Sequence, residues 1–322
     1  MRKAIGVDLG GSHVMAAVVE EDGRISSRDE IDIEDHAVDA VMHAVQQTID
    51  AAMGTLGDNR AVVGIGIGSP GNIDPRSGSV LWSPNFGWKD VPLGERLRAH
   101  FDLPVFVGND ARCATLGEYT YGTGRGTKNF VLLTLGTGIG GGIVAGGELL
   151  LGNHAGAGEF GHHQIRPTDG FVCACGKIGC FEAQASGTGL IRHAFALAAS
   201  FPRSRLLDKD RDKLGSKAIR KAAQAGDGHA LAAWRNYTSD LALGLANVVA
   251  FVNPETIALG GGVSSAAEFM LDVVRPRVDE LTTTVPRGMT KIVQAALGND
   301  AGAIGAATMA FRGGLTARYA AA

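Results

Sequence analysis

Hydrophobic and polar positions in the N-terminal part of the chain follow the two-residue spacing of β-strands. Strands are predicted at Lys3–Leu9, Val14–Glu20 and Arg24–Asp32. Glycine turns at Gly10-Gly11 and Asp22-Gly23 separate them, and the second is a hairpin signal. The chain therefore begins with a three-stranded meander.

The spacing then changes to that of a helix. Between His36 and Leu56 an apolar residue recurs at every third or fourth position, which predicts a helix with one buried stripe of Val38, Val41, Val45, Ile49 and Met53. The β-branched run at residues 61–67 predicts a fourth strand. The predicted order is strand, strand, strand, helix, strand, with a glycine turn between the first two strands.

A similar unit recurs later in the chain. Residues 129–135 and 139–145 are apolar strands around a glycine turn, several helical segments follow, and residues 255–259 form another strand that ends in glycines. Aligning VDLGGSHVMAAVV with LTLGTGIGGGIVA superposes the two glycine turns. We therefore predict an internal duplication that presents two phosphate-binding loops across a cleft. A C-terminal helix is predicted at residues 301–312.

Composition adds limits on compartment and partners. The 322 residues are 45% hydrophobic and 20% charged, which fits two ordinary α/β domains. A net charge of −3 without a long Lys/Arg cluster argues against nucleic acid or an anionic membrane as a partner. No apolar run reaches the ~18 residues of a membrane span, and the N-terminus lacks the apolar segment of a signal peptide, so we expect a cytoplasmic protein.

Three of the four cysteines lie within eight residues, as Cys173, Cys175 and Cys180. His162 or His163 lies about ten residues upstream. A Cys₃His set is typical of a closed tetrahedral zinc site, which is usually structural because no position remains for water. A disulfide loop or inert buried thiols are the alternative, and a reducing compartment disfavours the disulfide.

Two acids flank this cluster. Glu159 precedes His162 by three residues, and Glu182 follows Cys180 by two. Carboxylates accept hydrogen bonds from hydroxyls, and sugars offer several such donors in a fixed geometry. A loop folded around a metal would hold both carboxylates near the imidazole, which predicts a sugar site. Solvated surface acids remain the alternative for each residue taken singly.

The run E-x-G-H followed by C-x-C-G-x-x-G-C-x-E resembles the signature of the ROK family of repressors, open reading frames and kinases. The similarity extends from the DLGG start to the GGGV segment at residues 260–263. In that family the motif histidine is a zinc ligand whose neighbourhood also touches the sugar. Motif position favours His162, which lies eleven residues before Cys173, whereas His163 lies ten before it.

The resemblance implies an α/β fold, the two-lobed actin-like ATPase fold of hexokinases and RNase H, with duplicated mixed-sheet domains. The small lobe is predicted to comprise residues 1–109 and about 300–322, and the large lobe, with the zinc loop, residues 110–299. The boundary falls near Asn109 because a predicted strand ends there and a helix begins.

The first glycine turn, with Asp8, Gly10, Gly11 and Ser12, is a candidate phosphate site. Its backbone N–H groups can point at phosphate oxygens, and Asp8 can hold a hydrated Mg²⁺. A plain hairpin turn explains the motif about equally well, and only the matching second loop favours nucleotide binding. His13 departs from the residue usual in the family and is given no role.

The second loop begins with Gly136, Thr137 and Gly138. Glycines there let backbone donors approach the β- and γ-phosphates of ATP closely, and Thr137 adds a hydroxyl. Gly261 and Gly262, before a helix predicted at Ser264, resemble the element on the adenosine side of the family's nucleotide site.

Asn109 and Asp110 lie between a strand at residues 104–108 and a helix, where an N-cap is one interpretation. In similar sugar kinases the Asp is the general base for the attacked hydroxyl, and the Asn holds a neighbouring hydroxyl. Gly71 and Asn85 lie in segments that resemble loops of the family's sugar pocket, and turn formation is the alternative for each.

The resemblance thus implies an ATP-dependent hexose kinase that uses Mg²⁺, contains structural Zn²⁺ and makes the 6-phosphate of its sugar, and the segment PNFGWKDVPL favours glucose by resemblance. Kinases of N-acetylmannosamine, N-acetylglucosamine, mannose or fructose remain open, as does polyphosphate as donor. A sugar-sensing repressor of the same family would need an added helix-turn-helix, whereas the first strand is predicted at Lys3. The expected partner is a small-molecule sugar, bound by a homodimer or homotetramer.

Overall fold

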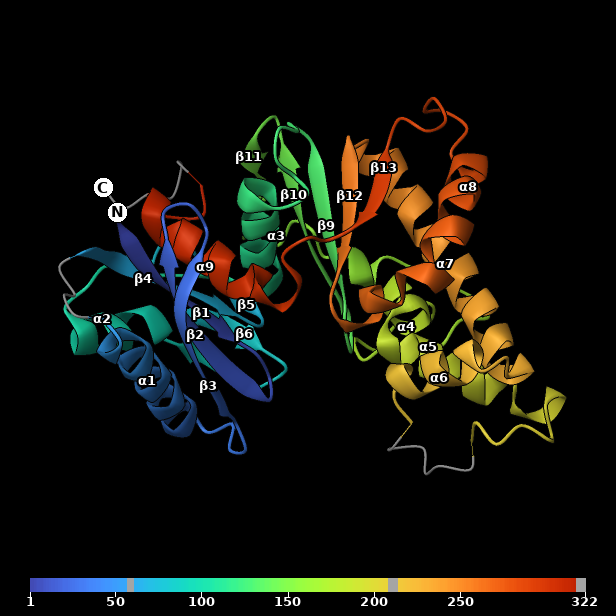
Figure 1. The fold of residues 1–322 in the computed structure, drawn as a ribbon, viewed down its shortest axis with the longest axis horizontal. Coiled ribbons are helices and arrows are strands. Elements are labelled where there is room, and N and C mark those ends of the chain that lie inside the picture. Colours follow the sequence, from blue (N-terminus) through green and yellow to red (C-terminus); the bar gives the residue numbers. More distant parts are fainter. Residues whose placement is uncertain (57–60, 208–213, 317–322) are drawn as a thin grey trace. The chain divides into compact units, whose positions relative to one another are not determined.

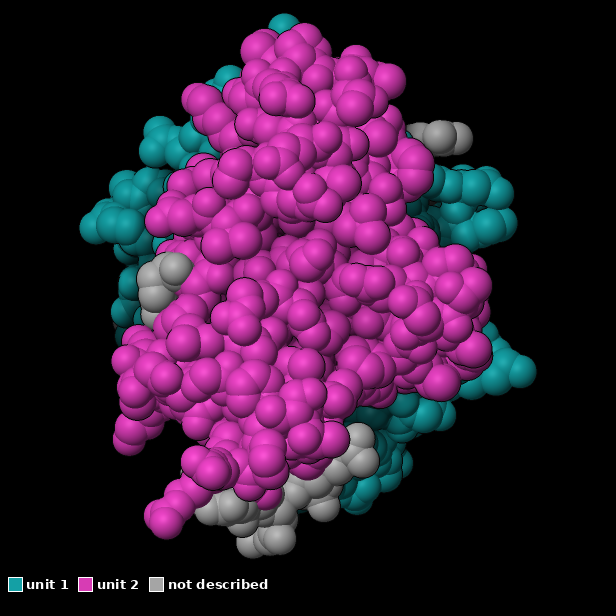
Figure 2. All heavy atoms as spheres, turned by 90° about the vertical axis from the view of Figure 1, so that its right-hand side faces the viewer, with its two compact units in different colours: residues 1–132, 142–158, 296–322 teal, residues 133–141, 159–295 magenta. Residues whose placement is uncertain are grey.

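The computed structural model describes residues 1–56, 61–207 and 214–316. The chain divides into two compact units (Figure 2), of which unit 1 comprises residues 1–132, 142–158 and 296–322 and unit 2 comprises residues 133–141 and 159–295. Unit 1 includes residues 110–132 and 142–158, which the sequence analysis grouped with the large lobe. Residues 317–322, the end of the predicted small lobe, lie outside the described part.

Unit 1 is built on a five-stranded mixed sheet in the order β3-β2-β1-β4-β8, of which Figure 1 labels β1 to β4. Antiparallel pairs join β1 (Lys3–Leu9), β2 (His13–Glu20) and β3 (Ile25–Asp32). Strands β4 (Val62–Ser69) and β8 (Val105–Asn109) extend the sheet in parallel from β1. The parallel strands end at Ser69 and Asn109, which are direct register partners.

Unit 1 also contains helices, a small three-stranded sheet and, within residues 130–132 and 142–149, parts of a second five-stranded sheet. The described helices are α1 (Val38–Gly54), α2 (Leu93–Phe101), α3 (Asp110–Tyr121) and α9 (Ala301–Arg312), with a 3₁₀ turn η6 (Gly298–Asp300) before α9. The small sheet, β5 (Asn72–Ile73), β6 (Val80–Ser83) and β7 (Trp88–Val91), was not predicted from the sequence.

The two faces of the main sheet of unit 1 bury side chains of different size. Branched residues such as Ile5 and Val7 pack with α1 and α2 in one core cluster. On the opposite face two alanines, Met15 and Val19 pack with the alanines of α9. A Cβ added to Gly66 of β4 would lie 1.8 Å from the carbonyl oxygen of Ala306, and one added to Gly305 would lie 1.6 Å from that of Cys113 in α3. Helix α9 can therefore pack this closely because β4 carries glycine where it meets α9, and α9 itself carries glycine where it meets α3.

We expect Gly305→Ala to lower the free energy of unfolding by about 1–3 kcal/mol or more, because the added methyl group forces backbone apart. Gly54→Ala is the matched control: Gly54 ends α1, and a Cβ there would meet no atom within 4 Å. The control should be unchanged or up to about 1 kcal/mol more stable. Urea denaturation measures both, and equal stabilities of the two variants would contradict this account of the packing.

A second five-stranded sheet has the order β11-β10-β9-β12-β13. It contains β9 (Phe130–Leu135), β10 (Ile139–Ala145), β11 (Glu148–Leu149), β12 (Thr256–Gly260) and β13 (Lys291–Gln294). The chain passes between the two units within β9 and again within β10. As in the first sheet, the strand after the first glycine turn lies beside the first strand, and a later strand adds on its other side. This repeated order confirms the predicted duplication.

The described helices of unit 2 surround α7 (Gly228–Val252), which packs against α4 (Phe181–Ala185), α5 (Gly187–Ala196), α6 (Ser216–Gln224) and α8 (Leu271–Leu281). Shorter 3₁₀ segments are η2 (Phe160–His162), η3 (Ala198–Ser200) and η5 (Gly262–Phe269). The segment η5 stands where a helix was predicted at Ser264. Among the described residues, no helix has the length and hydrophobicity that a bilayer crossing requires.

Candidate functional site

The first glycine turn is held by contacts within unit 1. The N–H of Gly10 donates to the carbonyl oxygen of His13 at 2.9 Å, and Nε2 of His36 lies 2.8 Å from the carbonyl oxygen of Gly11. A Cβ on Gly11 would lie 3.6 Å from Nδ2 of Asn85. The candidate phosphate turn and the candidate sugar residue Asn85 therefore lie next to each other.

Asp8 ends β1 beside this turn, and its carboxyl group lies against the first turn of α9. A Cβ on Gly302 would lie 2.4 Å from Oδ2 of Asp8. Burial, followed by the charge of Asp110, raises the pKa of Asp8 from 3.8 to about 6, against a smaller lowering by His13. Ser12 places its Oγ 3.3 Å from Nδ1 of His13. Above pH ~6 Asp8 is the ionised carboxylate that a hydrated Mg²⁺ needs.

The raised pKa of Asp8 predicts a pH-dependent stability in the absence of Mg²⁺ and nucleotide. The folded chain holds the Asp8 proton up to about pH 6, whereas the unfolded chain releases it near 3.8. The stability that this proton contributes is therefore complete below about pH 4 and is lost as the pH rises through about 6. We expect Asp8→Asn to gain stability relative to the original chain across this window. Urea denaturation from about pH 4 to 7.5 tests this, and parallel stability curves would contradict it.

The N-cap of α3 is formed by Asn109. Its Oδ1 accepts from the N–H of Arg112 at 3.2 Å, and its Nδ2 donates to the carbonyl oxygen of Gly71 at 3.1 Å. Gly71 has φ +114°, and a Cβ there would lie 2.3 Å from the carbonyl oxygen of Trp82, so the position requires glycine. Asp110 is the first residue of the helix, and its Oδ1 accepts from the next backbone N–H at 2.8 Å. Of the two residues, Asn109 therefore acts as the N-cap, and Asp110 does not.

The second glycine turn is held by the start of α5. The N–H of Gly136 donates to the carbonyl oxygen of Gly138 at 3.0 Å, which closes the turn. Its own carbonyl oxygen accepts from the N–H of Gly187 at 2.8 Å, and that of Thr137 accepts from Oγ1 of Thr188 at 2.9 Å. Carbonyl oxygens of the turn are thus engaged by the protein.

Gly261 and Gly262 follow β12. Gly261 has φ +79°, and a Cβ there would lie 2.7 Å from the carbonyl oxygen of Leu135. Its carbonyl oxygen accepts from Oγ of Ser264 at 2.7 Å. At Gly262 an added Cβ would meet no atom within 4 Å, so a bound molecule could approach the backbone there.

The two candidate sugar-binding glutamates differ in their surroundings. Glu182 lies in the first turn of α4; its Oε2 accepts from the N–H of Ile139 at 2.9 Å, and its Oε1 lies 3.7 Å from Sγ of Cys173. Glu159 is exposed and precedes η2, where its carbonyl oxygen accepts from the N–H of His162 at 3.1 Å. One carboxylate thus joins the glycine turn to the cysteine cluster, and the other lies at the surface.

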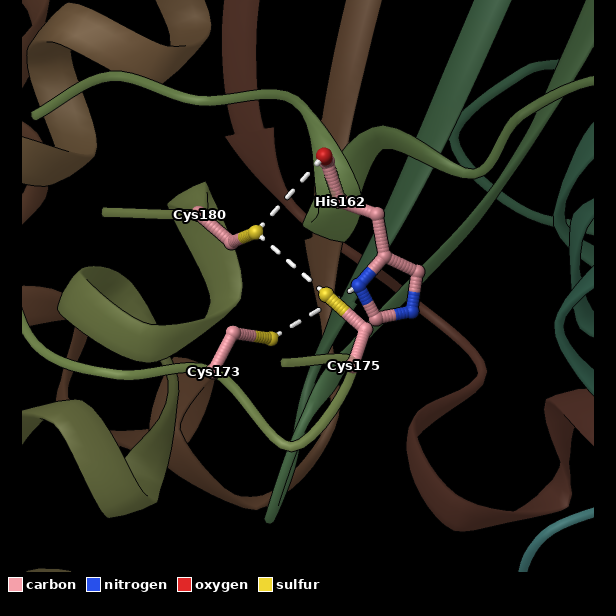
Figure 3. Close-up of side chains that lie close together, drawn as sticks. All are labelled: His162, Cys173, Cys175 and Cys180. Atoms are coloured by element: carbon pink, nitrogen blue, oxygen red, sulfur yellow. Dashed lines mark hydrogen bonds between the residues drawn. The ribbon is translucent and has the colours of Figure 1, made fainter. Parts of the chain in front are cut away.

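The Cys₃His set forms one cluster, shown in Figure 3: His162, Cys173, Cys175 and Cys180. One ligand atom from each lies within 4.8 Å of all the others. Sγ of Cys175 and Sγ of Cys180 are 3.6 Å apart, and Sγ of Cys173 is 3.8 Å from Nδ1 of His162. Zn–S bonds of about 2.3 Å in a tetrahedron separate two sulfurs by about 3.8 Å, so the four residues fit zinc.

His163 lies outside this cluster. Its Nδ1 lies 2.5 Å from the carbonyl oxygen of Phe160, its ring packs beside Phe181, and burial lowers its pKa. The 3₁₀ turn η2 directs the two adjacent histidines differently, and only His162 reaches the cysteines.

Backbone geometry and charge also suit a metal. Gly176 and Gly179 have φ of +86° and +74°, which lets the chain fold back between Cys173 and Cys180. A hydrogen bond from the N–H of Lys177 lowers the pKa of Cys175 to about 7, while desolvation raises the pKa of Cys173 and of Cys180. A cation among these sulfurs would offset that desolvation and favour thiolates.

The ROK family model matches residues 4–312. The chain belongs to the ROK family. This ROK protein is 36% identical over 316 residues to a glucokinase of Streptomyces coelicolor, covering 96% of this chain and 98% of the relative. Its family membership confirms the predicted actin-like fold with duplicated mixed-sheet domains.

Two solved structures represent the two branches of the ROK family. A ROK glucokinase from Streptomyces griseus, in complex with glucose and AMPPNP, has a TM-score of 0.85 and 36% identity, covering 97% of this chain and 100% of that one. A ROK transcriptional regulator, a homologue of the E. coli MLC protein, has a TM-score of 0.84 and 29% identity. The match covers 96% of this chain and 78% of the regulator. The ROK fold alone therefore does not separate kinase from regulator.

Sequence reasoning missed three residues that shape these sites in this ROK protein. They are His36 at the first turn, and Ile139 and Thr188 at the second. Each contacts a partner more than twenty residues away in the sequence, and no local spacing signals such a contact.

Proposed function

We propose that the chain transfers the γ-phosphoryl group of ATP to the 6-hydroxyl of glucose and releases ADP and glucose 6-phosphate. The similarity to glucokinases over nearly their whole length carries this proposal. The placement of the candidate residues on rigid turns and caps supports it, because phosphoryl transfer depends mainly on positioning and charge neutralisation.

Asp110 is the proposed general base. It takes the proton of the 6-hydroxyl as that oxygen attacks the γ-phosphorus, and the bond between the γ-phosphorus and the bridging oxygen of ADP breaks. Asn109 and Gly71, joined by a hydrogen bond of 3.1 Å, form a rigid wall next to it that holds a neighbouring hydroxyl. The rigidity favours one hydroxyl over its neighbours.

ATP is the proposed phosphoryl donor. Backbone N–H groups of the two turns bind its phosphate oxygens, at Gly11 and Ser12 and at Thr137 and Gly138. Gly10 and Gly136 take part through their lack of a side chain, since their own N–H groups close the turns. Gly261 and Gly262 take the adenosine side, where the open backbone at Gly262 supports close approach. Mg²⁺ supplies neutralisation of the phosphate charge, and Asp8 would hold it through water.

The sugar is proposed to be bound by Gly71, Asn85, Asn109, Asp110, Glu159, His162 and Glu182. We further propose that Zn²⁺ bound by Cys173, Cys175, Cys180 and Nδ1 of His162 is structural, since four protein ligands close the tetrahedron. The proposed location is the cytoplasm, as a homodimer or homotetramer without nucleic acid or membrane partners; the net charge of −3 supports the absence of such partners.

A coupled assay tests the function. Glucose, mannose, fructose, N-acetylglucosamine and N-acetylmannosamine are each offered with ATP or with polyphosphate. We expect glucose with ATP to give the highest kcat/KM. Another sugar or donor with a higher kcat/KM would overturn the assignment of substrate. Absence of turnover together with sugar-dependent binding to DNA would favour the regulator branch of the family.

A further inference from the structure

The segment that follows the last cysteine of the metal cluster contacts the second glycine turn residue by residue. Gly187 donates to the carbonyl oxygen of Gly136, and Thr188 to that of Thr137. Glu182 completes the series by accepting from the N–H of Ile139 at 2.9 Å. Glu182 is the one member of this series that uses a charged side chain, and such hydrogen bonds are stronger than neutral ones.

The contact depends on a close fit at Gly138. A Cβ added there would lie 2.4 Å from Oε2 of Glu182 and 3.0 Å from its carboxyl carbon. Gly161, which precedes the cluster's histidine, packs equally closely: a Cβ there would lie 2.4 Å from the carbonyl oxygen of Ile139 and 3.2 Å from Cβ of Glu182. Two glycines thus allow the carboxylate to reach the turn.

The backbone around Glu182 is fixed on both sides. Cys180, a residue of the metal cluster, is the N-cap of α4. The next residue, Phe181, is fully buried, donates its N–H to the carbonyl oxygen of His163 at 2.8 Å, and fits where α7 carries Gly244, whose added Cβ would lie 2.2 Å from the ring. The backbone that carries the glutamate is therefore already ordered, and only the side chain has to lose conformational freedom when it binds Ile139.

We propose that Glu182 is a positioning residue for the phosphoryl donor, which holds the Gly136–Ile139 turn in its phosphate-binding shape and couples that turn to the Cys₃His cluster. This inference rests on the proposed binding of ATP at the turn and adds a role beyond sugar contact. A side chain that only binds sugar affects sugar affinity, whereas a positioning residue also affects nucleotide affinity measured without sugar.

Two conservative variants distinguish the effect of the length of the Glu182 side chain from the effect of its charge. Glu182→Gln keeps the length and an acceptor oxygen for the N–H of Ile139 but removes the charge beside Cys173. Glu182→Asp keeps the charge but is one methylene too short to reach Ile139. Binding of Mg²⁺–AMPPNP is measured by calorimetry in the absence of sugar, together with the metal content of each protein and its glucose affinity.

We expect Glu182→Asp to weaken AMPPNP binding by about 10- to 100-fold and Glu182→Gln to stay within about fivefold of the original chain. Glu159→Asp is the matched control: the same shortening at the other predicted sugar carboxylate should lower glucose affinity and leave AMPPNP binding unchanged. Metal content should be the same in all variants.

Unchanged AMPPNP binding by Glu182→Asp, or weaker binding by Glu182→Gln than by Glu182→Asp, would overturn the positioning role. With either outcome, the proposed function still holds if the unsubstituted protein phosphorylates glucose. If the original chain binds no AMPPNP, the proposed function and this inference fail together.

Discussion

Asp110→Asn should lower kcat for sugar phosphorylation by about 10²- to 10⁴-fold, while the variant stays folded and binds sugar. Asn keeps the size and polarity of the side chain but cannot accept the proton of the attacked hydroxyl. The hydrogen bond that Oδ1 accepts from the next backbone N–H is retained by the amide oxygen of Asn, so the local backbone should not change. Steady-state kinetics and sugar calorimetry measure the two effects separately.

A matched control removes the same charge at a helix start outside the candidate site. Asp227 is the N-cap of α7, and its Oδ1 accepts from the N–H of Ala230 at 2.9 Å. Because Asn caps about as well as Asp, Asp227→Asn should cost less than about 1 kcal/mol of stability and leave kcat unchanged. Near-original turnover of Asp110→Asn at saturating sugar and ATP would exclude Asp110 as the base, and Glu159 or Glu182 would be the next candidates.

The sequence predicted those elements whose side chains obey a regular spacing. The first strand, Lys3–Leu9, and the last helix, Ala301–Arg312, have the predicted limits, because each is a continuous, largely buried run of small and apolar residues that is followed by glycine. The duplication was visible because both copies place a glycine turn after the same kind of strand. The strand before Asn109 and the helix after it were likewise predicted, although the small sheet nearby was not.

That small sheet gave no signal because its strands are too short for a period. β5 has two residues, and β6 and β7 have four each, and the prolines and glycines in the segments around them indicated only turns. The 3₁₀ segment η5 is a similar case, since the glycines before it and the non-helical Ala266 within it replace a regular helix.

The candidate site could be predicted by residue type but not by geometry. His162 and His163 differ by one residue, and only the turn η2 decides which imidazole meets the cysteines. The contact between Glu182 and Ile139 spans 43 residues, so the sequence suggested a sugar ligand and gave no sign of the glycine turn. Such contacts between distant residues depend on tertiary packing; here the lack of side chains at Gly138 and Gly161 leaves room for Glu182 to reach Ile139.

Cys175→Ser should remove the metal and weaken sugar binding together. If the about 10–16 kcal/mol of a structural zinc site is divided among four ligands, one thiolate accounts for about 2.5–4 kcal/mol, which is on the order of a hundredfold in metal affinity. Cys175 is exposed, so serine fits without a cavity, and any loss is attributable to the metal. Elemental analysis should find about one zinc per chain in the original protein and much less in the variant.

Ala174→Ser is the matched control, because it adds the same hydroxyl to the neighbouring exposed position and leaves all four ligands in place. The control should keep its metal and its glucose affinity. The link to sugar follows from Cys180 and Glu182, which lie on one short helical turn, so a loop without metal loses the fixed backbone that aims the carboxylate. A metal-free Cys175→Ser protein with full glucose affinity and turnover would show that the cluster and the sugar site are independent.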